Sequence, residues 1–345
     1  MLKWFEQKGE HDDIVISSRV RLARNLKKYP FGVRLTEQGA NELFEEVKAG
    51  MEHYKDVSGN YFTCKLNELG EIDKLAMVER HILSPQIVNK KQCNGLILSE
   101  DESAGIMINE EDHLRIQTFT GGMNMKTAFS RANEIDDRIQ EKFEIAFDEK
   151  YGYLTSCPTN VGTGLRASYM IFLPALSGAG KITKLASEVS KYGVTLRGLY
   201  GEGSKSQADI FQISNQKTLG THESDIIQSL NNIVMQVIKQ ERLRREYVLN
   251  KNYNEIEDQV YRSYGVLKYT RQINTKDAMT LLSQVKFGAD TGIISLEGDR
   301  SIYQMMMNIQ PYGLQYGFGK NIGSVQRERL RAEYINKNLP ELKSR

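Results

Sequence analysis

The hydrophobic pattern of the chain changes near residue 250, and this change limits its possible folds more than any other feature. Before it, short apolar runs typical of strands, at 94–100, 104–110 and 193–200, alternate with segments of helical period. Two such segments, 125–147 and 181–192, keep apolar residues on one face, so we expect both helices to cover one side of a sheet. This part of the chain is therefore predicted to be a mixed sheet-and-helix domain.

Strand signals fade in the last part of the chain. A long helix is expected from His222 to about Asn250, and 253–338 is mostly helical by period, with turn signals such as Ser263 to Gly265. We predict an α+β protein with a mixed domain over 1–250 and a small α-helical domain over 251–345.

Composition excludes several classes of protein. The formal net charge is +2, from 46 Lys and Arg against 44 Asp and Glu, so any basic binding site has to be local. The three cysteines, Cys64, Cys93 and Cys157, have no metal-ligand or disulfide spacing. No run of about 18 apolar residues predicts a membrane span. Because the first residues also lack the apolar core of a signal peptide, a cytoplasmic location is expected.

Four separate segments carry the arginines that suggest a function. They are SSRVRLARN at 17–25, NEEDHLR at 109–115, CPTNVGTGLRAS at 157–168 and RGLYGEG at 197–203. Their candidate phosphate ligands are Arg19, Arg21, Arg115, Arg166 and Arg197. Guanidinium groups bind phosphate oxygens bidentately, so a fold that gathers these side chains would suit a polyphosphate. Any one of these motifs alone would usually be ordinary surface charge, whereas four together favour a site.

Two of the same segments also supply carboxylates, Glu111 and Glu202. One cleft could then hold a nucleotide triphosphate beside a positively charged group, which predicts a phosphotransferase with a cationic acceptor. The glycine-rich segment contains no GK[ST], so it does not predict a P-loop. Its Gly162 and Gly164 more simply allow a turn or a close approach of the backbone to a substrate.

The SRVR segment, NEEDHLR and CPTNVGTGLRAS, in this order, resemble the signatures of the phosphagen (guanidino) kinases, the family of creatine and arginine kinases. The variants SSRVRLARN, GYLTSCPTNVGTGLRAS, FQISNQKTLG and DQVYRSYGVL are most similar to its bacterial protein-arginine kinases, from about Ile14 to Ala332. The resemblance implies a catalytic domain with a largely antiparallel sheet flanked by helices, followed by a small helical domain.

The resemblance also implies the nucleotide site. The five arginines would hold the phosphates of ATP, because phosphoryl transfer passes through a charge-dispersed state that cations stabilise. Mg²⁺ would be carried by ATP, and no protein ligand is assigned to it. Further nucleotide contacts are expected from Ser17, Ser18, Val20, His81, Ala167, Ser168, Tyr169, Met170, Gly198, Leu199, Tyr200 and Gly201.

On the acceptor side, the resemblance assigns Glu111 and Glu202 to the acceptor guanidinium, with Glu111 favoured as general base. A guanidinium is a poor nucleophile until it is oriented and loses a proton, and carboxylates can do both. Glu110 and Asp112 are expected to support the site or face the magnesium. Cys157 lies where the family has a reactive cysteine, and nearby cations would favour its thiolate. An inert cysteine at a strand end is the alternative.

The class of acceptor is less constrained. Metabolic phosphagen kinases carry a helical domain before the first motif that closes over a small substrate, and only sixteen residues precede Ser17. This difference favours arginine side chains of proteins as acceptors. A kinase of free arginine or another guanidino compound is one alternative, and a non-catalytic adaptor of ClpC is another. The intact Glu111 and Glu202 argue against an adaptor without activity.

The segment RERLRA at 327–332 resembles a motif with which related protein-arginine kinases bind phosphoarginine at a second, allosteric site. Arg327, Arg331 and Ala332 match that motif, and Glu328 stands where aspartate is expected. A solvated helix face is an equally good interpretation, because alternating Arg and Glu are common there.

The resemblance further implies partners. We expect a homodimer whose products are recognised by the ClpC–ClpP degradation machine under stress, with the activator McsA and the repressor CtsR as further partners. The apolar cluster Met305, Met306, Met307 and Ile309 fits either the core of the helical domain or a dimer contact, and methionine more often fills a core.

Overall fold

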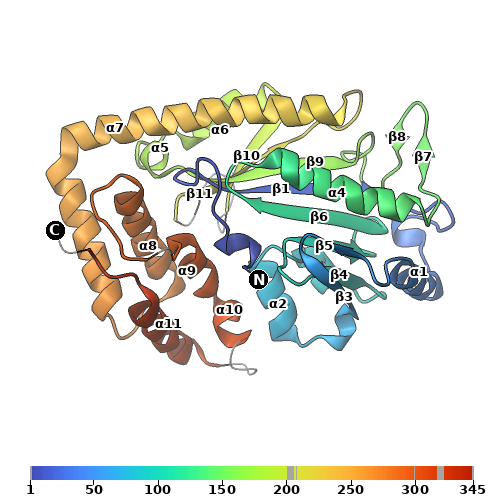
Figure 1. The fold of residues 1–345 in the computed structure, drawn as a ribbon, viewed down its shortest axis with the longest axis horizontal. Coiled ribbons are helices and arrows are strands. Elements are labelled where there is room, and N and C mark those ends of the chain that lie inside the picture. The colour runs from blue at the N-terminus through green and yellow to red at the C-terminus, as the bar shows by residue number, and fades with distance from the viewer. Residues whose placement is uncertain (1, 200–205, 207, 299, 317–321, 344–345) are drawn as a thin grey trace.

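The computed structural model in Figure 1 describes residues 2–199, 206, 208–298, 300–316 and 322–343. Its main feature is a nine-stranded sheet in which all neighbouring strands are antiparallel. In spatial order the strands are β10 (Val194–Gly198), β11 (Ile210–Asn215), β9 (Leu165–Phe172), β1 (Val15–Arg24), β6 (Leu114–Gly121), β5 (Ala104–Ile108), β4 (Gly95–Ser99), β3 (Gly59–Lys65) and β2 (Lys55–Asp56). A separate hairpin contains β7 (Phe147–Asp148) and β8 (Gly152–Tyr153).

Helices occupy both faces of the sheet and most of the last third of the chain. They are α1 (Glu37–Gly50), α2 (Glu71–Glu79), α3 (Pro85–Val88), α4 (Met125–Gln140), α5 (Pro174–Gly178), α6 (Ile182–Ser190), α7 (Glu223–Tyr269), α8 (Thr275–Asp290), α9 (Ile302–Asn308), α10 (Pro311–Tyr316) and α11 (Ser324–Asn338). Short 3-10 turns are η1 (Trp4–Glu6), η2 (Gly32–Arg34) and η3 (Leu66–Glu68). The predicted α+β class and the predicted helical end of the chain are confirmed.

One face of the sheet is covered by α1, α4, α6 and the first half of α7 (Figure 1). Apolar side chains that alternate along β1, such as Val20 and Leu22, pack there against Ala128, Ala132 and Leu230. The three predicted strands correspond to β4, β5 and β10, and the two predicted helices do share one face.

The helix predicted over 125–147 is too long. It ends at Gln140, because the following residues pair with other chain segments instead of continuing the helix. The backbone N–H of Ala146 donates to Asn25 O at 2.8 Å, and that of Leu154 donates to Ala146 O at 3.0 Å.

On the opposite face, two sets of helices cover different parts of the sheet. Over one end, Phe119, Met170 and Phe172 of the strands share an apolar core with Trp4 and with the C-terminal helices. Over β4 and β5, helices α2 and α3 cover a smaller core. Met305, Met306 and Met307 are buried in the first of these cores, so the described contacts place them in the core of the chain itself.

Helix α7 is longer than predicted and joins the two parts of the molecule. It spans 47 residues and bends at Asn252, whose φ of −132° and ψ of 34° are not helical. The break predicted at Ser263 to Gly265 is wrong, because these residues lie inside the helix, where Ser263 and Tyr264 are buried. Among the described residues, no helix is long and apolar enough to cross a membrane.

Candidate active site

The pleat of the sheet brings the arginines of four segments to one face. Side chains two residues apart on a strand point to the same side, and so do side chains of paired residues on neighbouring strands. Arg21 of β1 pairs with Arg166 of β9, and Ala23 of β1 pairs with Arg115 of β6. Arg19 therefore shares this face. Arg197 of β10 also lies on it, since it pairs with Gln212, which pairs in turn with Met170 of β9.

This gathering of cations is electrostatically costly in the absence of an anion. Burial and the neighbouring Arg115 and Arg166 lower the pKa of Arg19 to about 9. Burial followed by Arg19 lowers the pKa of Arg21 well below its ordinary value, and burial followed by Arg197 lowers that of Arg166. The Nε of Arg21 is buried without a hydrogen-bond partner. A bound polyphosphate would supply the missing charge and acceptors.

Protein groups position these cations, but among the described residues few carboxylates pair with them. Arg166 Nη1 donates to Asn215 O at 2.9 Å, and Arg19 Nη2 donates to the amide oxygen Gln212 Oε1 at 3.4 Å. Arg115 is the exception, because its Nη1 lies 2.7 Å from the carboxylate oxygen Glu110 Oε1.

The acidic residues lie on the tight turn between β5 and β6. Asn109 adopts a φ of 59°, which asparagine tolerates, and its amide donates to two carbonyl oxygens that anchor the turn. Glu110 follows as a buried carboxylate. Besides Arg115, it accepts from Ser84 Oγ at 2.6 Å and from the N–H of Glu111 at 2.9 Å. Glu110 is thus fully occupied in holding the turn and one arginine.

Asp112 also accepts hydrogen bonds from protein donors, whereas the side chain of Glu111 is exposed to solvent. Asp112 Oδ1 accepts from Asn25 Nδ2 at 2.7 Å and from the N–H of Ser156 at 2.5 Å. The side chain of Glu111 is exposed, and its pKa is raised by partial burial and by the negative charges of Asp112 and Glu110. Of the three acids, Glu111 is the exposed one, and its surroundings increase its basicity.

A cavity of about 170 Å³ connects the cations with Glu111. It is lined by Arg21, Ala23, Glu110, Glu111, Asp112, Arg115, Cys157, Thr159, Asn160, Gly164 and Arg166. Cys157 belongs to this lining, with its Sγ 3.1 Å from Thr159 Oγ1. The predicted Glu202, Tyr200 and Gly201 lie outside the described residues.

A second, wider groove of about 1,010 Å³ is also lined by Glu111. Glu110 and Glu111 line both the cavity and the groove, so these two hollows adjoin at Glu111, the candidate base. Its remaining wall is formed by residues 29–32, 34 and 35 together with Lys90, Gln92, Thr155 and Ser156. The 29–35 segment was not predicted from the sequence. Its only local signal is the turn-forming YPFG at 29–32, which indicates no chemistry.

Two protein-family profiles match the chain. One, described as the ATP:guanido phosphotransferase C-terminal catalytic domain, covers residues 42–244, and one described as the protein-arginine kinase McsB C-terminal domain covers residues 253–345. The protein-arginine kinase of Desulforamulus reducens is 40% identical over 342 residues, which cover 99% of this chain and 96% of the relative. That of Clostridium novyi is 42% identical, with 98% of each chain covered. The chain belongs to the protein-arginine kinases of the ATP:guanido phosphotransferase family.

Solved structures of other kinases share the fold of this protein-arginine kinase. The duplicated taurocyamine kinase of Schistosoma mansoni matches with a TM-score of 0.62 at 24% identity, over 72% of this chain and 37% of that longer chain. Lombricine kinase matches with a TM-score of 0.60 at 23% identity, over 70% of this chain and 69% of the other. The expected resemblance to a phosphagen-kinase fold is confirmed.

Within this protein-arginine kinase, not all predicted nucleotide contacts lie together. Strand alternation turns Ser18, Val20, Ala167 and Tyr169 toward the face that α1, α4, α6 and α7 cover, away from the arginines. Ser18 Oγ donates to Gly122 O at 2.8 Å and accepts from the N–H of Asn124 at 2.9 Å, so it fixes the start of α4.

The other predicted contacts are nearer the cations. Ser17, Ser168 and Met170 share the arginine face, and Gly198 ends β10 beside Arg197. Leu199 packs at the margin of the core that the sheet shares with the C-terminal helices. His81 lies close to Arg19, and burial together with that charge lowers its pKa to about 3. This imidazole is therefore neutral.

The RERLRA segment lies on α11, outside the sheet that carries the arginine face. Arg331 is buried, and it donates from Nε to Ile309 O at 2.9 Å and from Nη1 to Ile273 O at 3.0 Å. Ala332 is also buried, whereas Arg327 and Glu328 are half-buried. Arg331 thus ties three segments of the helical part together, and a role in binding phosphoarginine stays a prediction.

Proposed function

We propose that this protein-arginine kinase transfers the γ-phosphoryl group of ATP to protein arginines at the point where its two hollows meet, with Glu111 as general base. The observation that carries the proposal is that Glu111 lines both hollows. Glu111 borders both the cation-lined cavity and the open groove, so a donor in one and an acceptor in the other could both reach it.

The phosphate side would be held by the arginine face. ATP carries about four negative charges, and burial and mutual repulsion lower the pKa values of Arg19, Arg21 and Arg166, which a bound polyanion would relieve. Because these side chains project from paired strands, their spacing is fixed before the nucleotide binds. Such preorganised cations can stabilise the charge that spreads over the transferred group without rearranging.

The acceptor side would use Glu111. As the carboxylate accepts a proton from the guanidinium, a nitrogen lone pair forms the new N–P bond, and the bond between the γ-phosphorus and the bridging oxygen breaks to release ADP. The raised pKa of Glu111 makes it a better proton acceptor than an ordinary carboxylate. Cys157 and Glu202 are proposed as further contacts to the acceptor guanidinium.

Magnesium would reach this site on the nucleotide. The described residues contain no cluster of three or more His, Cys, Asp or Glu side chains suited to a metal ion. The neighbouring acids Glu110 and Asp112 already accept hydrogen bonds from protein donors. When bound to the phosphates, Mg²⁺ would neutralise part of their charge.

The groove supports a polypeptide rather than a free amino acid as the acceptor. Its volume of about 1,010 Å³ is far larger than one arginine side chain needs, and it is open to solvent. The side chains of Tyr29, Phe31 and Leu35 offer apolar contacts along its wall. A peptide could therefore cross the groove and extend one arginine to Glu111.

Family membership supports a proposed role in regulated degradation. In this proposal the chain forms a homodimer, phosphorylated proteins are delivered to ClpC–ClpP under stress, and McsA and CtsR are partners. A pull-down comparing phosphorylated with untreated casein on purified ClpC would test the first partner. Equal retention of both samples would contradict it.

The main experiment incubates the protein with Mg²⁺-ATP and casein, with free arginine as the parallel acceptor. Acid-labile phosphate on casein arginines, found by mass spectrometry at neutral pH, would support the proposed acceptor. A Phe31→Ala variant should weaken phosphorylation of casein while leaving any reaction with free arginine unchanged. An equal loss with both acceptors would contradict the groove as the polypeptide site.

A further inference from the structure

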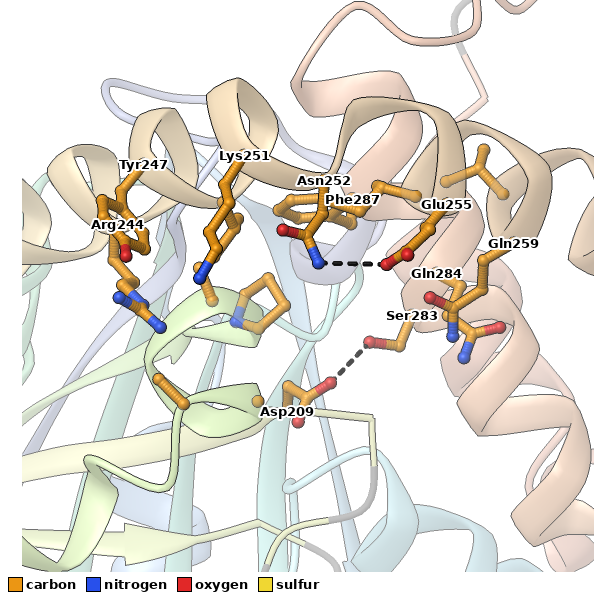
Figure 2. Close-up of a pocket in the computed structure, with 17 residues that line it drawn as sticks. Asp209, Arg244, Tyr247, Lys251, Asn252, Glu255, Gln259, Ser283, Gln284 and Phe287 are labelled. Atoms are coloured by element: carbon orange, nitrogen blue, oxygen red, sulfur yellow. Dashed lines mark hydrogen bonds between the residues drawn. The ribbon is translucent and has the colours of Figure 1, made fainter.

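A separate cavity of about 530 Å³ lies at the bend of α7 (Figure 2). Its walls come from α5, from α7 on both sides of Asn252 and from α8, so it lies between the sheet-bearing part and the C-terminal helices. None of its lining residues lines either of the hollows at Glu111. Its volume falls within the range of about 300–1,000 Å³ that is typical of small-molecule sites.

Two cations from α7, Arg244 and Lys251, point into this cavity (Figure 2). The neighbouring Arg242 and Arg245 are paired, at 2.7 Å with Asp13 and at 3.0 Å with Glu241. In the described part of the chain, Arg244 and Lys251 have no carboxylate partner. Arg244 is held over the ring of Tyr247 at 4.7 Å, and its Nε is buried without a hydrogen-bond partner. The Arg244 guanidinium therefore has a buried donor available to a ligand.

The opposite side of the cavity carries acceptors. Asp209 lies across from the cations in Figure 2 and accepts from Ser283 Oγ at 3.0 Å. Asp209 lines the cavity and adopts a φ of 56°, an uncommon conformation for a residue other than glycine. Glu255 accepts from Asn252 Nδ2 at 3.0 Å at the bend itself. Each carboxylate has further acceptor capacity for a ligand hydroxyl.

We propose that this cavity binds a small phosphate monoester whose remainder carries hydroxyl groups. The phosphate would bind between Arg244 and Lys251, because a monoester carries about 1.5 to 2 negative charges at neutral pH and these are two unpaired cations. The hydroxyls would donate to Asp209 and Glu255. The ligand would bridge both halves of α7 and α8, and its binding would hold the bend at Asn252 in one geometry. This inference is independent of the proposed catalytic roles.

Ribose 5-phosphate is the probe for this site, because it combines one phosphate monoester with several hydroxyls. The arginine face is first saturated with Mg²⁺ and a non-hydrolysable ATP analogue, so that it cannot take up the probe. Hydrogen–deuterium exchange of the backbone is then followed in 244–260 and 281–290. The proposal predicts saturable protection of both segments by ribose 5-phosphate, weaker protection by inorganic phosphate and none by ribose.

Variants assign the effect to the named side chains. The double variant Arg244→Gln and Lys251→Gln should bind the probe roughly tenfold more weakly or worse, since it loses both charged donors. Lys239→Gln, an exposed lysine of the same helix outside the cavity, should bind like the parent. If the double variant unfolds, Lys251→Gln alone replaces it. All variants should still phosphorylate casein.

Three outcomes would overturn the proposal. One is the absence of protection in both segments at millimolar ribose 5-phosphate. A second is equal protection of the parent and a folded double variant. Protection that inorganic phosphate reproduces at the same concentration would reject the hydroxyl contacts to Asp209 and Glu255 and with them the proposed ligand class.

Discussion

At the scale of single residues, Glu111 differs from the buried Glu110 and Asp112 because its side chain is exposed. Glu110 and Asp112 hold protein donors, and Glu111 faces both hollows. We expect Glu111→Gln to lower the rate of arginine phosphorylation by roughly 100-fold or more while ATP still binds, since the amide keeps the shape and loses the basicity. Turnover by mass spectrometry and nucleotide binding by calorimetry would measure this.

The control for this prediction is Glu149→Gln, which changes an exposed glutamate on the β7–β8 hairpin. Near-parent turnover by Glu111→Gln would contradict the assigned base.

The raised pKa of Glu111 also predicts the direction of the pH dependence. Because the base must be unprotonated, activity should fall with decreasing pH at a higher pH than for an ordinary carboxylate.

Substitution of Arg21 should show how much the repulsion between the neighbouring arginines destabilises the fold. Without nucleotide, Arg21→Gln removes a buried cation that Arg19, Arg115 and Arg166 repel, so we expect a gain of about 1 kcal/mol in the free energy of unfolding. With ATP the order should reverse, because the parent gains more from binding the nucleotide. Melting curves with and without Mg²⁺-ATP would show this crossing. Arg329→Gln, at an exposed arginine, should show no such crossing.

At the scale of elements, α11 depends on Arg331. Arg331→Ala removes the donors to Ile309 O and Ile273 O inside the helical part, so the variant should lose about 2–4 kcal/mol of stability. The exposed Arg329→Ala on the same helix should lose little. Denaturant titration would measure both. If Arg331→Ala keeps its stability but loses activation by phosphoarginine, the ligand-binding interpretation of RERLRA gains support.

The contact between α7 and α8 depends on one glycine. A Cβ on Gly288 would lie 2.3 Å from Val260 Cγ1, whereas one on Gly265 of α7 would meet no atom within 4 Å. We therefore expect Gly288→Ala to destabilise the fold by about 1–3 kcal/mol. Gly265→Ala should stabilise it by about 0.5–1 kcal/mol through helix propensity. Thermal melting of the matched pair would test this, and equal shifts would contradict the close approach.

At the scale of the whole molecule, Glu79 links the two parts of the chain. From the end of α2 its carboxylate accepts from the N–H groups of Tyr312 and Gly313 at the start of α10, with shortest distances of 3.0 and 2.7 Å. Burial raises its pKa from an ordinary value of 4.5 to about 7. The folded state therefore binds more protons than the unfolded state between these values, and stability falls as pH rises through them.

The effect of this link is measurable by substitution. Glu79→Gln keeps an oxygen acceptor and removes the titration, so the melting temperature of the parent relative to the variant should decline between pH 5 and pH 8. The corresponding change in free energy should be about 1–3 kcal/mol. A constant difference across this range would show that Glu79 does not titrate with folding.

Much of the site could be predicted because it depends on short-range patterns. The motifs identify the candidate arginines and acids in the sequence. Strand alternation alone places Arg19 and Arg21 on one side of β1. The same alternation argues against Ser18 and Tyr169 as side-chain contacts, although the motif resemblance included them. The groove wall at 29–35 could not be predicted, because its residues become relevant only through their position beside Glu111.

By itself, the sequence determined the family, the chemical groups of the site and most strands and helices, since each follows from residue type and local period. Tertiary structure decided the rest. The pairing of Arg21 with Arg166 and the burial of Ser263 and Tyr264 within one helix depend on contacts between distant segments. So does the cavity at the bend of α7, whose walls come from three helices. Long-range packing overrides weak local signals, because burial of apolar surface outweighs single-residue propensities.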